Sequence, residues 1–92
     1  MSLKDDYLKG LEAFEKKDYE QAKNHFLRVM EQGGQNFPDV LNKLALILSL
    51  EGNREEAVTY LKKALEINPK YTEAAVNLAY LLNELGKYEE AM

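Results

Sequence analysis

A single histidine, His25, and the absence of cysteine limit the catalytic chemistry open to this 92-residue chain. Nucleophilic catalysis needs a serine or cysteine paired with a base that a third group orients, and no motif signals such a set. Gly33 and Gly34 lack the spacing and the following lysine of a phosphate-binding loop. We therefore interpret His25 as a structural residue on a helix. We predict that the protein is not an enzyme and has no catalytic residues and no cofactor.

Pairs of adjacent acids are the other candidates for chemistry: Asp5-Asp6, Glu55-Glu56 and Glu89-Glu90. Neighbouring side chains diverge on a helix, so a pair of this kind does not converge on a metal ion. Negative charge is favourable in the first turn of a helix, where it opposes the helix dipole. The pairs therefore indicate helix starts, and we expect no metal site.

Charge and hydropathy narrow the possible partners. The net charge of −4, with basic residues spread among acids, argues against nucleic-acid binding. The most apolar run, Leu44–Leu50, is shorter than the roughly 20 residues that cross a bilayer, and no membrane partner is expected. The first residues show no apolar signal region. Together with the lack of cysteine, this favours a cytoplasmic location.

An internal repeat organises the chain. Residues 17–22, 52–57 and 86–91 are three versions of one block, with Ala22, Ala57 and Ala91 at spacings of 35 and 34 residues. Apolar segments of helical periodicity flank the blocks. The pattern predicts helix-turn-helix units with helices at 4–16, 19–32, 38–51, 54–67 and 72–85, followed by a short stub.

The blocks have the residues of tight turns. Gly52 and Gly86 stand where a helix end favours a left-handed residue, and Asp18 suits the start of the next helix. Lys17 replaces the glycine in the first block, and a left-handed lysine carries a strain of roughly 1–2 kcal/mol. Small residues predict close helix contacts at two repeated places: Gly10, Ala45 and Ala79, and Ala22, Ala57 and Ala91.

The chain has the 34-residue period, small residues repeated on the first helix of each unit, the pattern Gly-x-Tyr-x-x-Ala and the pair Asn68-Pro69. This combination resembles the tetratricopeptide repeat (TPR). The resemblance covers essentially the whole chain, with departures at Lys17, at Gly34 in place of proline, and in a third repeat that stops at Met92. It implies an all-α, right-handed solenoid of antiparallel helix pairs. We predict a single TPR domain over 1–92, with repeats at about 3–37, 38–71 and 72–92, the last truncated.

The resemblance implies a protein–protein interaction scaffold that holds a helical or extended segment of a partner in a concave groove. The groove residues that it implies are Tyr7, Leu11, Phe14, Asn42, Leu46, Leu50, Val76, Tyr80 and Asn83. Leu11, Phe14 and Leu50 have core packing as an alternative role. Family members that bind acidic chaperone tails use a basic clamp. The matching residues here are Tyr7, Leu11, Lys43, Glu73 and Asn77, so we expect weak binding of such tails.

A second function remains open. The segment Ala74–Leu82 is apolar on nearly every face, whereas the last helix of a solenoid normally turns a polar face to water. This predicts a stacking module that forms homo-oligomers through its C-terminal helix, with Met92 in the contact.

Overall fold

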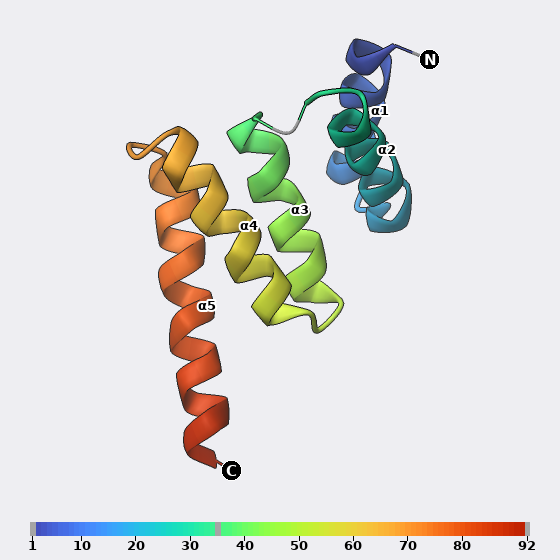
Figure 1. Ribbon diagram of the computed structural model, residues 1–92. Coiled ribbons are helices and arrows are strands. Elements are labelled where there is room, and N and C mark those ends of the chain that lie inside the picture. Colours follow the sequence, from blue (N-terminus) through green and yellow to red (C-terminus); the bar gives the residue numbers. More distant parts are fainter. Residues whose placement is uncertain (1, 35, 92) are drawn as a thin grey trace. The chain divides into compact units, whose positions relative to one another are not determined.

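The computed structural model describes residues 2–34 and 36–91, and the side chains among them up to Gly86. These residues form helices alone: α1 (Leu3–Glu15), α2 (Tyr19–Glu31), α3 (Pro38–Leu50), α4 (Arg54–Ile67) and α5 (Thr72–Ala91) (Figure 1). The all-α prediction is confirmed, and the first four helices begin and end within a residue of the predicted positions. The chain divides into two compact units, residues 1–36 and 37–92.

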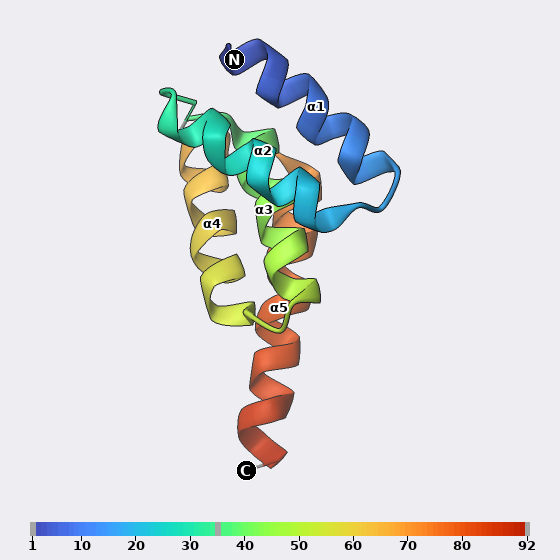
Figure 2. The same ribbon diagram turned by 90° about the vertical axis from the view of Figure 1, so that its right-hand side faces the viewer.

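The first unit is the antiparallel pair of α1 and α2 (Figure 2). Phe26 of α2 is fully buried and lies against Gly10 of α1, where an added Cβ would stand 2.6 Å from the ring. Ala22 and Val29 complete the buried stripe of α2. The small residue at position 10 therefore allows the two helices to approach, as predicted.

The turn between α1 and α2 holds the one positive-φ residue other than glycine in the described chain: Lys17, at φ 64°. Gly52 takes the same place after α3, at φ 90°. Asp18 caps α2, with its carboxylate oxygen accepting a hydrogen bond from the Gln21 amide at 3.3 Å. A left-handed residue was expected at this place of both turns. At position 17 the Cβ of lysine strains the left-handed backbone, whereas glycine has no Cβ to clash.

The second unit contains α3, α4 and α5. Its core is made of Val40, Leu41, Leu44, Ala45, Ile47, Leu48, Ala57, Val58, Leu61, Ala64, Ala74 and Leu81. Helix α3 is antiparallel to α4, α5 packs along α4, and α3 and α5 run in the same direction (Figures 1 and 2). The nearly all-apolar α3 is buried on most sides because α4 and α5 both contact it.

The prediction of a turn at Gly86 was wrong, because α5 continues as a helix through Gly86 to Ala91. Its C-terminal part projects past the turn between α3 and α4 (Figure 1). Ala79 is exposed rather than packed, since among the described residues no helix lies over it. A continuous helix satisfies its backbone hydrogen bonds without the tertiary contacts that a turn and a second helix would require. No helix in the described ranges is long and apolar enough to cross a membrane.

Candidate partner-binding surfaces

In the first unit, three of the predicted groove residues lie on α1. Tyr7, Leu11 and Phe14 are each half-buried. Phe14 packs edge-on against Tyr19 at the start of α2, with ring centroids 5.6 Å apart. Phe14 therefore contributes to the packing of the hairpin while keeping part of its surface accessible.

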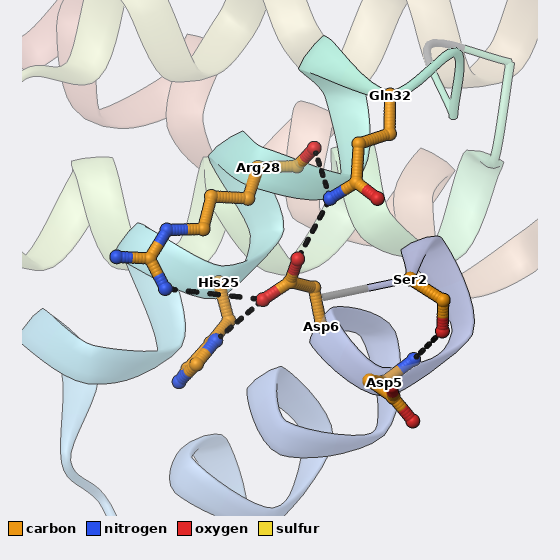
Figure 3. Close-up of polar contacts among 6 residues, drawn as sticks. All are labelled: Ser2, Asp5, Asp6, His25, Arg28 and Gln32. Atoms are coloured by element: carbon orange, nitrogen blue, oxygen red, sulfur yellow. Dashed lines mark hydrogen bonds and ion pairs between the residues drawn. The ribbon is translucent and has the colours of Figure 1, made fainter.

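The same unit holds a buried polar cluster that the sequence did not predict (Figure 3). Asp6 is only 1% exposed, and its carboxylate accepts hydrogen bonds from His25 Nδ1 at 3.0 Å and Gln32 Nε2 at 2.7 Å. Arg28 Nη1 lies 3.9 Å from the same carboxylate. The hydrogen bonds from His25 and Gln32 hold the pKa of the Asp6 carboxyl below its ordinary value. The cluster ties α1 to α2, and this gives His25 the structural role that we predicted.

In the second unit, apolar side chains reach solvent on α3 and α5. Leu50, Val76 and Tyr80 are 67%, 62% and 63% exposed, and Leu46 is half-buried. We call these four residues the α3–α5 face. Monomers seldom leave large side chains clustered in water without a function.

A hydrogen-bonded group lies at one end of this face. Asn42 is fully buried; its Oδ1 accepts from Asn77 Nδ2 of α5 at 2.9 Å, and its Nδ2 donates to the Tyr71 hydroxyl at 3.4 Å. Asn42 therefore has no surface of its own for a partner. Its contribution to the face is to hold α5 beside α3.

Charged residues border the face. Asp39 and Lys43 belong to α3, and Glu73 and Glu84 to α5. Asn83, the remaining predicted groove residue, is exposed on α5. Burial first, and then the negative charges of Glu73 and Asp39, raise the pKa of the Tyr71 hydroxyl. Asp39 and Glu73, from two different helices, thus act on one hydroxyl.

The structure has a hollow at the turn between α3 and α4. It is lined by residues 52–56 and Leu85, and none of the predicted groove residues lines it. Within residues 2–34 and 36–91, no group of three or more histidine, cysteine or acidic side chains is placed to hold a metal ion. The exposed apolar face, rather than a pocket, is the feature suited to recognition.

Comparison with known proteins supports the repeat assignment. Tetratricopeptide-repeat family models match residues 7–32 and 48–92. The chain belongs to the tetratricopeptide-repeat family, whose members are protein-interaction scaffolds. The TPR2B domain in a solved TPR2B–pHsp70 complex of yeast Sti1 is similar in fold, with a TM-score of 0.80 and 21% identity over 97% of this chain and 70% of that one.

Two relatives are similar in sequence. The protein STIP1 homolog of Dictyostelium discoideum is 35% identical over 82 residues, which are 89% of this chain and 14% of the relative. An uncharacterised protein of Methanocaldococcus jannaschii is 49% identical over 41 residues, or 45% of this chain and 48% of the relative. The chain therefore matches less than half the length of each relative.

Proposed function

We propose that this chain is a protein-interaction module that binds a helical or extended segment of another protein. The binding residues lie on α1, α3 and α5, the first helix of each repeat. The observation that carries the proposal is the α3–α5 face, where Leu50, Val76 and Tyr80 are each more than 60% exposed. Aromatic and aliphatic side chains of this kind serve as anchors for a peptide. Tyr7, Leu11 and Phe14 are proposed to bind the partner on the first unit in the same way.

Nothing in this function requires catalysis. Among the described residues, the two buried polar side chains hold helices together: Asp6 joins α1 to α2, and Asn42 joins α3 to α5. We accordingly propose a non-enzymatic scaffold. The pHsp70 complex of the similar TPR2B domain is consistent with a protein or peptide partner.

A second candidate function rests on another side of α5. Ala75, Ala79 and Leu82 are exposed at helical spacing. A stripe of small and apolar residues allows another helix to pack closely, so we propose stacking on a second copy as the alternative. Light scattering after size exclusion tests it: a concentration-dependent dimer supports self-association, and a 10.6 kDa monomer at millimolar concentration contradicts it.

A pair of variants separates the two functions. A phage-displayed library of random 16-residue peptides is selected on the wild-type chain, and the recovered peptides are measured by fluorescence polarisation. Tyr80→Glu should abolish peptide binding and leave the oligomeric state unchanged, whereas Leu82→Glu should do the reverse. Both residues are exposed on α5, so the two variants are matched for effects on folding. Peptide binding that is insensitive to Tyr80→Glu would overturn the proposed face.

A further inference from the structure

We propose that the segment bound on the α3–α5 face is basic: a lysine or arginine of the partner lies against Asp39 and Glu73, and its apolar side chains cover Leu46, Leu50, Val76 and Tyr80. This inference rests on the proposed function and adds the chemistry of the partner.

The charged residues that border the α3–α5 face are mostly acidic. On α3, Asp39, Lys43, Leu46 and Leu50 follow one another at intervals of three or four residues and so share one side of the helix. Glu73, Tyr80 and Glu84 share one side of α5 in the same way. Among the side chains that the structure describes on these two helix sides, three carboxylates and one ammonium group border the apolar residues, for a net charge of −2. Charge complementarity therefore favours a cationic segment.

Two of these acids, Asp39 and Glu73, lie at the same end of the α3–α5 face. Asp39 lies in the first turn of α3 and Glu73 in the first turn of α5. Asp39 precedes Asn42 by three residues and Glu73 precedes Asn77 by four, and the side chains of Asn42 and Asn77 are hydrogen-bonded at 2.9 Å. The two carboxylates therefore come to the same end of the face from different helices. A guanidinium or ammonium group placed there reduces their mutual repulsion and gains charge-assisted hydrogen bonds.

The alignment of α3 and α5 determines how far the apolar anchors lie from the acidic end. The hydrogen bond between Asn42 and Asn77 sets α5 beside α3, and the two helices run in the same direction (Figures 1 and 2). Leu46 follows one turn after Asn42, and Tyr80 follows one turn after Asn77. At a rise of about 1.5 Å per residue, the apolar anchors lie roughly 5–16 Å along the helix axes from Asp39 and Glu73. The partner should carry a basic residue and apolar residues about one to three helical turns apart.

The peptide selection described above tests this chemistry directly. Peptides whose binding is lost in Tyr80→Glu are expected to be enriched in lysine and arginine beside apolar residues. For a basic peptide of that pool, the double variant Asp39→Asn/Glu73→Gln should weaken binding at least tenfold at low salt. The double variant Glu55→Gln/Glu56→Gln, which removes two exposed first-turn acids of α4, is the matched control and should leave the affinity within twofold. Circular dichroism confirms that each variant is folded.

The possible results separate the two proposals. If Tyr80-dependent peptides are recovered but are acidic or neutral, the face binds peptides and the inference about charge is wrong. If Asp39→Asn/Glu73→Gln and the Glu55→Gln/Glu56→Gln control weaken binding equally, the effect is one of overall charge, and the inference also fails. If no peptide depends on Tyr80, the proposed function itself fails.

Discussion

Asn77 Nδ2 of α5 donates a hydrogen bond to Asn42 Oδ1 of α3 at 2.9 Å, across 35 residues of sequence. Asn42 has no solvent-accessible surface, so neither water nor a partner can replace this bond. The bond lies at one end of the α3–α5 face and aligns the two helices that border it. A buried asparagine with its partners in place therefore favours one alignment of α5 over alternatives.

Replacing Asn42 should destabilise the chain. Asn42→Leu keeps the branching and the number of side-chain heavy atoms but leaves the Asn77 amide and the Tyr71 hydroxyl without their partner. The expected loss is about 1–3 kcal/mol in the free energy of unfolding, measured by urea denaturation. Asn83→Leu, at an exposed position of α5, is the control and should change stability by no more than about 0.5 kcal/mol. Equal effects of the two variants would contradict the role of Asn42.

The Asp6 cluster should make stability depend on acid pH. The pKa of Asp6 is lowered in the folded chain from an ordinary value of 3.8, so its stabilising effect is present above that value. The effect is lost as the pH falls through the folded pKa, because protonation then favours the unfolded state. We expect Asp6→Asn to be less stable than the wild type at pH 7 and to show a smaller further loss between pH 5 and about pH 2.

The neighbouring acid is the control for this pH dependence. Asp5→Asn removes an exposed carboxylate from the same turn of α1 and should retain the wild-type loss at acid pH. Urea denaturation at several pH values measures both variants. A wild-type pH profile in Asp6→Asn would show that the cluster does not contribute.

Lys17→Gly should stabilise the first unit. At φ 64° a lysine carries a strain of roughly 1–2 kcal/mol, and glycine removes it at a backbone entropy cost of roughly 0.5–1 kcal/mol. The net gain, up to about 1.5 kcal/mol, should raise the melting temperature by several degrees. Lys62→Gly, in the middle of α4, should lower it instead. A lower melting temperature for Lys17→Gly would refute the strain argument.

Gly10→Ala should destabilise the α1–α2 hairpin. The new methyl group would lie 2.6 Å from the ring of Phe26, which has no exposed surface through which to move aside. Overpacking of this kind costs about 1–3 kcal/mol. Thermal unfolding followed by circular dichroism measures the loss, and the second-site change Phe26→Leu should recover part of it. An unchanged stability of Gly10→Ala would mean that α1 and α2 can move apart without a loss of free energy, and would contradict the prediction.

Gly86→Ala tests the continuity of α5. Gly86 lies inside the helix, and an added Cβ there meets no atom within 4 Å. Alanine at a helix-interior position is favoured over glycine by about 1 kcal/mol, so stability and helix content should rise. If residue 86 instead adopts a left-handed turn, as the repeat pattern predicts, alanine would be strained there and both quantities would fall. Gly52→Ala is the comparison, because residue 52 is left-handed at φ 90°. This variant should lower the stability, and the loss measures the strain of an alanine in such a turn.

The local structure of this protein could be predicted from sequence because its signals are local. The 34- and 35-residue spacing, the apolar periodicity and the glycines mark four of the five helices to within a residue at each end. The strain at Lys17 could be anticipated because Gly52 and Gly86 stand at the same place in the other two blocks. Gly10 was predicted to lie at a close contact because small residues stand at the equivalent place of the other repeats.

Tertiary structure alone decided which polar groups meet. No periodicity pairs Asp6 with His25. Asn42 and Asn77 stand 35 residues apart, at equivalent places of two successive repeats, but only the packing of α3 beside α5 brings their side chains into contact. The turn at Gly86 was mispredicted because a glycine allows a left-handed turn without imposing it, and in this chain the helix continues past it. By itself, the sequence determined the helices and their repeat. Packing decided that Asn42 is buried while Leu50, Val76 and Tyr80 face water, since only the neighbours of a helix determine which of its sides are covered.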